Sequence, residues 1–213
     1  MLRQTMIYLK KLWIKFRYSH FLRLFFDALA RLGIRIAFYY FFQDINSPNK
    51  LINRPAGFDD YEVSFWGPEE MKQMALIPGR KFSEEFLVQR LTDGHKCIGF
   101  KKGNELVAFS WCNLKEISVK WNLHPLKKDE GYLFDAYTLL DYRGKGISPF
   151  LRSHFYKELH KLGRTKLYSY VDCFNTSSIR FKQKLEAKKV KLILIFDLFG
   201  KWHLSFLLKD YQK

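Results

Sequence analysis

Several features are scarce in this sequence of 213 residues. It has three cysteines, an odd number without metal-ligand spacing, so neither a disulfide framework nor a zinc site is expected; they are Cys97, Cys112 and Cys173. The histidines form no pair on one helical face, so no metal is expected. No signal peptide is recognisable, which together with the few cysteines predicts a reducing, cytoplasmic setting. No run approaches the roughly 20 apolar residues that span a bilayer.

Acidic residues are also in deficit. The 37 Lys and Arg outnumber the 21 Asp and Glu, a formal net charge of +16, which indicates an anionic partner such as a nucleotide-like cofactor, a nucleic acid or a membrane surface. Zinc-finger spacing and an aromatic RNP motif are missing, so no nucleic-acid partner is expected. Hydrophobic residues make up 47% and aromatic residues 18%, enough for the core of one domain and for an apolar ligand tunnel.

The N-terminal segment is the most basic part of the chain. Residues 1–36 carry eight Lys and Arg and one acid, a net charge of +7. Apolar and aromatic residues recur every three or four positions over 1–31, which predicts an amphipathic helix. Two interpretations stay open. The helix lies in the inner membrane surface as a peripheral contact, or it docks on its own domain with a solvated basic face.

Hydrophobic periodicity and turn residues predict the other elements. Helices are expected at 68–77, 84–92, 149–162 and 176–185, and strands at 34–42, 61–65, 96–100, 106–113, 132–140, 166–173, 190–198 and 202–209. The strand at 61–65 is expected to be the first of the main sheet, residues 43–60 a loop, and 115–129 an irregular strand or loop. This divides the chain into a segment 1–42, made of the basic helix and a leading strand, and a domain 61–209.

The stretch GYLFDAYTLLDYRGKGIS, residues 131–148, combines a strand, a basic glycine loop and a helix start. Glycines allow the backbone to turn and let a ligand approach closely. A helix N-terminus and two cations beside it attract a phosphate or pyrophosphate. Neither the P-loop pattern nor G-x-G-x-x-G is present. An ordinary basic turn remains the alternative.

This loop resembles the coenzyme A pyrophosphate loop of the GNAT superfamily of N-acetyltransferases, [QR]-x-x-G-x-[GA]. Arg143 and Gly146 match, and Ser148 replaces the last small residue. A second stretch, NTSSIRF from Asn175 to Phe181, resembles the family pattern N-x-x-[AS]-x-x-[LF]. The order of expected elements also resembles that family. The chain departs from it where many members carry a Tyr general acid, because Lys182 stands there, and where Gly-Phe follows, which is Glu186-Ala187.

The resemblance implies a fold, a donor and a set of binding residues. The fold is an α/β, GNAT-like central mixed sheet, mostly antiparallel and flanked by helices, with an extra N-terminal amphipathic helix. The donor is acetyl-CoA or another acyl-CoA. The pantetheine arm would bond the strand backbone, the pyrophosphate would bind the loop, and the next helix start would contact the pantetheine. These cofactor-binding residues are Thr138, Leu139, Leu140, Arg143, Gly144, Lys145, Gly146, Ile147, Ser148, Asn175 and Ser178.

The same resemblance implies direct attack of an amine on the thioester, which requires a base because free amines are mostly protonated at neutral pH. Asp135 and Tyr137 share one face of the central strand, near the implied thioester. Asp135 is the expected base, with a structural carboxylate as the alternative. Tyr137 is a tunnel wall or a catalytic group. Lys182 is expected to be a solvated helix residue or a contact of the coenzyme phosphates, and Cys173 a small core thiol.

The predicted function is therefore acyl transfer from acyl-CoA to a small-molecule or lipid-linked amine. A long-chain acyl group on a carrier protein is a variant of the donor. The alternatives from other classes are a non-catalytic protein that binds coenzyme A or membranes, and a nucleic-acid binder favoured by charge alone. The acceptor cannot be derived from the fold, because function depends on the site.

Overall fold

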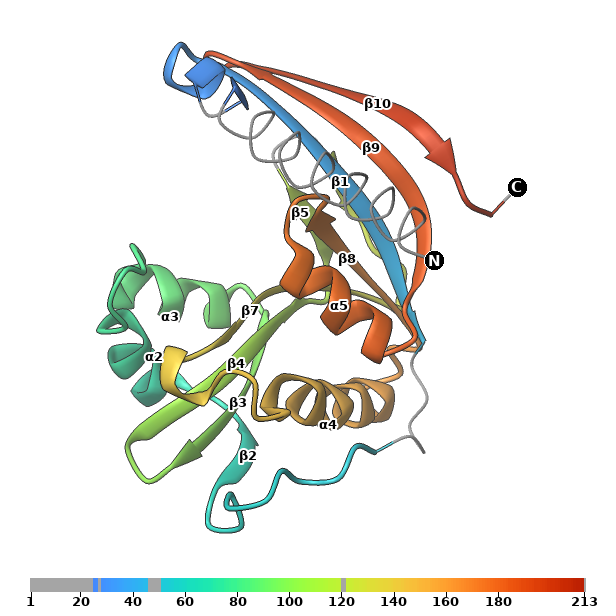
Figure 1. The fold of residues 1–213 in the computed structure, drawn as a ribbon. Coiled ribbons are helices and arrows are strands. Elements are labelled where there is room, and N and C mark those ends of the chain that lie inside the picture. The colour runs from blue at the N-terminus through green and yellow to red at the C-terminus, as the bar shows by residue number, and fades with distance from the viewer. Residues whose placement is uncertain (1–24, 27, 46–50, 120–121, 213) are drawn as a thin grey trace, which may run out of the picture.

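The computed structural model describes residues 25–26, 28–45, 51–119 and 122–212 (Figure 1). Most of the N-terminal helix expected over 1–31 lies outside these residues, while 25–26 and 28–31 are helical. Gly33 follows with a left-handed φ of 83°, and β1 begins at the next residue. A left-handed turn favours glycine, which has no Cβ, so the predicted break at Gly33 is confirmed.

Eight strands of the described chain form one sheet in the spatial order β10-β9-β1-β8-β7-β4-β3-β2. Neighbours are antiparallel, except that β7 and β8 are parallel. The strands are β1 Ile34–Ile45, β2 Glu62–Phe65, β3 Lys96–Lys102, β4 Glu105–Asn113, β7 Glu130–Thr138, β8 Lys166–Asp172, β9 Lys188–Leu198 and β10 Trp202–Asp210. The mixed, mostly antiparallel sheet that the resemblance implies is confirmed.

The position of β1 differs from the prediction. The strand expected to open the main sheet, 61–65, is β2 at the sheet edge, and β1 precedes it within the same sheet. β1 is antiparallel to β8 on one side and to β9 on the other. It therefore connects the C-terminal hairpin to the rest of the sheet. The limits 1–42 and 61–209 stay a prediction, but the leading strand belongs to the sheet of the larger unit.

The expected helices are found with small differences at their ends. They are α2 Pro68–Ala75, α3 Glu84–Thr92, α4 Ile147–Lys161 and α5 Thr176–Lys184, with a short 3-10 helix η1 at Leu140–Tyr142. Ser83 caps α3 as predicted, because its hydroxyl accepts a hydrogen bond from the Phe86 amide. Within the tract 115–129, β5 Glu116–Val119 and β6 Asn122–Pro125 pair antiparallel as a separate two-stranded sheet. None of the described helices is both long and apolar enough to cross a membrane.

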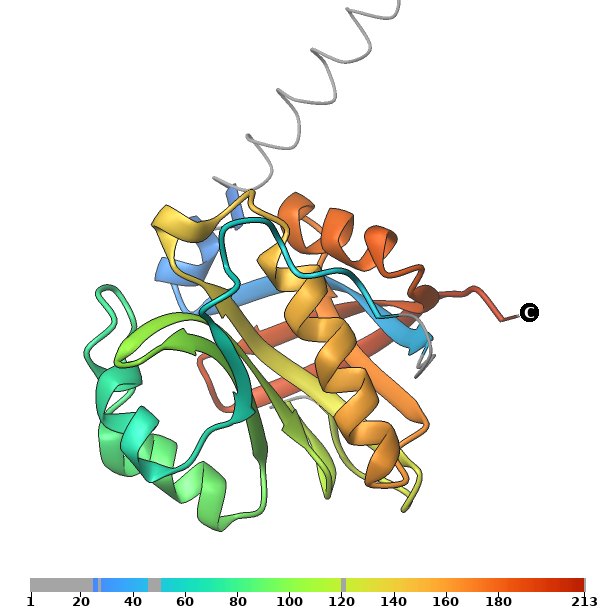
Figure 2. The same ribbon diagram turned by 90° about the horizontal axis from the view of Figure 1, so that it is seen from below.

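The helices cover both faces of the sheet. Successive side chains of a strand point to opposite faces, and Leu133 and Phe134 of β7 belong to two different apolar clusters. Leu133 packs in a cluster with Phe155 and Leu159 of α4. Phe134 packs against a cluster with Met71 of α2. Hence α4 covers one face and α2 and α3 the other, with α5 beside α4 (Figures 1 and 2).

Candidate active site

The two parallel strands at the centre of the sheet, β7 and β8, are paired only over their first residues and then diverge. Within the described chain, β7 and β8 are paired from Glu130 with Lys166 to Tyr132 with Tyr168. Beyond this point β7 stays paired with β4, and β8 stays paired with β1. The facing edges of the two strands therefore diverge, and their backbone groups there are not bonded to each other. Such an edge can bond an extended ligand as an added strand.

A β-bulge lies in the diverging part of β7. Phe134 pairs with Trp111 and Tyr137 with Phe109, so two residues of β7, Asp135 and Ala136, lie opposite one residue of β4. Asp135 has a φ of 46°, in the left-handed region that is uncommon for residues other than glycine. The carboxylate of Asp135 bonds Arg80 Nη2 at 2.5 Å and Arg90 Nη1 at 2.8 Å.

These contacts bear on the predicted role of Asp135 as a base, which stays a prediction. Each of its two oxygens accepts a charge-assisted bond from a guanidinium, and the side chain is mostly buried. The two guanidinium groups thus occupy both carboxylate oxygens and hold the side chain in place. The geometry therefore supports the alternative, a structural carboxylate that holds the bulge. Sequence reasoning missed Arg80 and Arg90 because they lie 55 and 45 residues away, and no short-range pattern connects them to the strand.

Tyr137 lies half-buried between cations. The Arg80 guanidinium lies 5.0 Å from the centre of its ring and the Arg143 guanidinium 5.3 Å. Its ring also contacts Phe109, with centroids 5.9 Å apart. The face of an aromatic ring attracts cations, so Tyr137 connects the bulge to the glycine loop. Its catalytic role stays a prediction.

The glycine loop has the geometry of an anion cradle. Gly144 and Gly146 have φ of 79° and 78°, and α4 begins directly after Gly146. The first N–H groups of the helix, at Ile147 and Ser148, have no intrahelical acceptor. No side chain caps this helix among the residues that the structure describes. The Arg143 and Lys145 side chains are exposed, so their charges are available to the same ligand.

The loop is also fixed to the end of β7. Ser148 Oγ lies 2.8 Å from Thr138 Oγ1, and Arg143 Nε donates to the Thr138 carbonyl at 3.0 Å. At two residues the backbone geometry disfavours the predicted pantetheine contact. The Leu139 amide already donates to the Val107 carbonyl, and Leu140 lies beyond β7, in η1. Since backbone groups alternate along a strand, the Thr138 amide points toward the open edge and remains the candidate.

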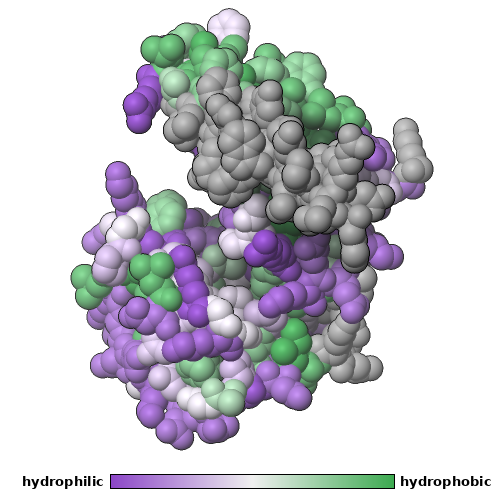
Figure 3. All heavy atoms as spheres, in the orientation of Figure 1, coloured by the Kyte–Doolittle hydropathy of each residue, from purple (hydrophilic) through white to green (hydrophobic). Residues whose placement is uncertain are grey.

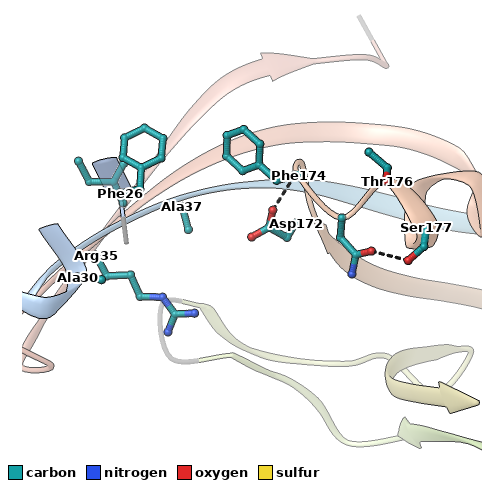
Figure 4. A pocket seen from close by; sticks show the side chains of 10 residues that line it. Phe26, Ala30, Arg35, Ala37, Asp172, Phe174, Thr176 and Ser177 are labelled. Atoms are coloured by element: carbon teal, nitrogen blue, oxygen red, sulfur yellow. Dashed lines mark hydrogen bonds between the residues drawn. The ribbon is translucent and has the colours of Figure 1, made fainter. Parts of the chain in front are cut away.

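The start of α5 borders a cavity. Asn175 caps the helix, because its Oδ1 accepts from the Ser178 amide at 3.0 Å and from Ser177 Oγ at 2.9 Å. A cavity of about 580 Å³ opens beside this cap (Figure 4). It is lined by Phe26, Ala30, Arg35, Ile36, Ala37, Asp172, Phe174, Asn175, Thr176 and Ser177. Asn175 lines this space, whereas the glycine loop is not part of its wall.

A family model described as Acetyltransferase (GNAT) family matches residues 58–186, more than half of the chain. The chain belongs to the GNAT acetyltransferase family. Members of this family are acyltransferases that typically use acetyl-CoA and act on amine acceptors. The matched range contains the divergence of β7 and β8, the glycine loop and Asn175. The comparison with curated proteins finds no match.

Solved GNAT structures share the fold. A GCN5-related N-acetyltransferase from Sphaerobacter thermophilus has a TM-score of 0.54 at 12% identity, covering 86% of this chain and 56% of that one. One from Kribbella flavida has 0.53 at 12%, covering 79% and 62%. A GNAT-family acetyltransferase from Colwellia psychrerythraea has 0.54 at 15%, covering 78% and 57%. The chain thus spans less than two thirds of these proteins, and the likeness concerns the fold.

The position of the usual GNAT tyrosine serves another purpose here. Lys182 is buried, and its Nζ bonds both carboxylate oxygens of Asp44 at 2.8 and 2.7 Å. The prediction of a solvated residue or a coenzyme contact is therefore wrong. Asp44 lies in β1 rather than in the expected loop 43–60. Phe42 and Asp44 are two residues apart and share a face of β1, a signal that could have placed Asp44 in the core.

The three thiols lie in surroundings that disfavour the thiolate form. Burial raises the pKa of Cys112 to about 12 and that of Cys173 to about 11. Both thiols therefore stay protonated at neutral pH, and a thiol is a weak nucleophile compared with a thiolate. Cys97 is also fully buried. Within the described ranges, no three His, Cys, Asp or Glu residues gather as a metal site.

Proposed function

We propose that this protein transfers an acyl group from a coenzyme A thioester to an amine by direct attack. The observation that carries the proposal is the divergence of β7 and β8 beside the left-handed glycine loop that begins α4. Together these features provide an open strand edge for an extended arm and an anion cradle for its pyrophosphate.

The donor site can be assigned by residue. The amides of Ile147 and Ser148, with Arg143 and Lys145, would hold the pyrophosphate of acetyl-CoA or another acyl-CoA. The pantetheine arm would follow the open edge of β7 at Thr138 toward Asn175. The cavity of about 580 Å³ beside Asn175 has a size typical of small-ligand sites, and it extends this path.

The reaction needs no covalent enzyme intermediate. The amine nitrogen attacks the thioester carbonyl carbon, the carbon–sulfur bond breaks, and the amine proton leaves to solvent or to the departing thiolate. Backbone amides at the divergence of the strands can stabilise the oxyanion. Asp135 does not take the proton in this scheme, because Arg80 and Arg90 occupy both of its oxygens. Tyr137 and water are the groups left for proton transfer.

One observation favours a second candidate. Lys182 is held by Asp44, so it cannot protonate a departing thiolate as the family tyrosine would. A protein that binds coenzyme A without catalysis fits this loss. Measured acyl transfer to an amine distinguishes the acyltransferase from the non-catalytic binding protein. The acceptor remains a small-molecule or lipid-linked amine, and an acyl carrier protein remains an alternative donor.

The decisive experiment begins with mass spectrometry of the acyl-CoA that co-purifies with the protein. The protein is then incubated with that thioester and a panel of amines, and thiol release and N-acylated products are measured. Acyl transfer supports the proposal. Tight acyl-CoA binding without product from any amine supports the non-catalytic candidate. Absence of coenzyme A binding would refute both.

A further inference from the structure

The C-terminal hairpin exposes an unusual amount of apolar surface. β10 is an edge strand of the sheet, and nearly all of its side chains are exposed. We call the following exposed residues the apolar ridge: Leu32, Phe199, Trp202, Leu204, Phe206, Leu207 and Leu208. In Figure 3 apolar surface covers the upper edge of the molecule, where β9 and β10 lie in Figure 1. An unusually large amount of exposed apolar surface marks an interaction surface.

At the tip of the apolar ridge, two turns are held together by a hydrogen bond and a close contact. The Phe199 amide donates to the Gly33 carbonyl at 2.6 Å, so the β9–β10 turn is fixed to the turn before β1. A Cβ on Gly33 would lie 2.6 Å from the Phe199 ring. Phe199 itself has a φ of 54°, a left-handed conformation that is uncommon for a bulky residue. The two turns together present Leu32, Phe199 and Trp202, each about 70% exposed, to the outside.

The charges around the apolar ridge are positive. Arg31 and Lys201 are exposed at its tip. Residues 188–212 contain five Lys and two Asp, a net charge of +3. The two acids, Asp197 and Asp210, accept hydrogen bonds from the backbone of Gly200 and Gln212. An apolar strip with Trp and Phe beside cations has the composition of surfaces that insert shallowly into anionic bilayers.

A second copy of the chain fits the ridge less well. Edge strands that avoid pairing carry bulges and lysines, and β10 has a register shift between Leu207 and Lys209. Lys209 is exposed on this strand. Two copies with a net charge of +16 each would also repel one another. The same charge attracts an anionic lipid surface.

We propose that the apolar ridge docks this protein on the surface of an anionic lipid bilayer. Phe199, Trp202 and Leu32 enter the interface, and Arg31 and Lys201 contact the lipid headgroups. The proposal concerns the folded hairpin and the turn before β1, and Arg31 is the one residue that it shares with the predicted membrane contact of residues 1–31. It is also independent of the acyltransferase function.

The test is co-sedimentation of the full chain with vesicles of phosphatidylcholine in which about a third of the lipid is phosphatidylserine. The wild type is expected to bind these vesicles, to bind less at high salt, and to bind pure phosphatidylcholine weakly. The variant Phe199→Ser/Trp202→Ser is expected to lower the partition coefficient about tenfold or more, because two large apolar side chains lose their burial. Both residues are exposed, and thermal melting checks the fold.

The matched control is Leu76→Ser/Leu123→Ser, which removes two exposed leucines outside the ridge and is expected to bind like the wild type. Trp202→Phe keeps the apolar surface, so its partition coefficient should lie within about twofold of the wild-type value. It should nevertheless lose part of the quenching of tryptophan fluorescence by brominated lipids. Wild-type binding by Phe199→Ser/Trp202→Ser would overturn the proposal and assign attachment to another part of the chain. A wild-type dimer that ignores vesicles and dissociates in this variant would overturn it in favour of a second copy.

Discussion

The Nζ of Lys182 in α5 and the carboxylate of Asp44 in β1 form a buried ion pair at 2.7 Å. The Tyr156 hydroxyl of α4 donates to the same carboxylate at 2.6 Å, so three elements distant in sequence meet at one charge. Arg152, also on α4, is buried nearby, and its Nε and Nη1 have no hydrogen-bond partner among the described residues. The pair therefore fixes β1, and the hairpin that depends on it, to the two helices.

Lys182→Met should destabilise the protein by about 3–5 kcal/mol, because it leaves the buried Asp44 carboxylate without its cation. Lys182→Met/Asp44→Leu should recover much of the loss, since both charges are then removed. Urea unfolding at neutral pH measures both variants. A single variant as stable as the wild type would show that the pair makes no contribution.

The pair also predicts a pH dependence. Burial, the largest cause, lowers the pKa of Lys182 from 10.5 to about 8 despite the nearby Asp44. Between these two pH values the unfolded chain binds more protons than the folded one, so the contribution of this group to stability rises with pH. The difference in unfolding free energy between the wild type and Lys182→Met should therefore grow from pH 7.5 to about 9.5. A difference that falls over this range contradicts the assignment.

Asp135→Asn should lower stability by about 1–3 kcal/mol, because Arg80 and Arg90 lose their shared anion. Any loss of kcat should come from a displaced bulge and persist at high pH. If Asp135 were the base, its loss would behave differently. The rate would recover at high pH, where the acceptor amine is already deprotonated. Chemical unfolding and the pH profile of kcat separate the two roles. Full stability together with rate recovery at high pH would make Asp135 the base after all.

Gly146→Val should abolish measurable coenzyme A binding. A β-branched residue at a φ of 78° is strained and shifts the amides that begin α4. The control is Gly163→Val, which imposes the same strain at a φ of 75° just beyond the other end of α4. Calorimetry with coenzyme A should show loss in the first variant and wild-type affinity in the second. Equal affinity in both would disprove the pyrophosphate assignment.

Cys173→Ser should keep turnover within about twofold of the wild type, because a thiol whose pKa is raised to about 11 supplies almost no thiolate at neutral pH. Acyl-enzyme should not accumulate in rapid mixing with acyl-CoA, as detected by intact-protein mass spectrometry. A covalent acyl adduct on Cys173 would replace direct attack with a two-step mechanism.

Local pattern was sufficient for most elements and for the glycine loop. Apolar periodicity located α4 and the main strands, and the residues from Arg143 to Ser148 indicated the anion cradle from their own chemistry. These are short-range properties: glycine permits left-handed backbone, and a helix start exposes its amides wherever it lies. The family resemblance depended on the same residues.

Contacts between residues distant in sequence determined the roles of the charged residues and the position of β1 in the sheet. Whether Asp135 is a base or a structural carboxylate depends on Arg80 and Arg90, and whether Lys182 is solvated depends on Asp44, 138 residues away. The place of β1 between β8 and β9 depends on backbone pairing, which side-chain alternation does not specify. Partners distant in sequence set the burial and the neighbouring charges of an ionisable group, and these determine its role. The elements and the loop could therefore be predicted from local pattern, whereas the roles of the charged residues became clear only from their partners in the folded chain.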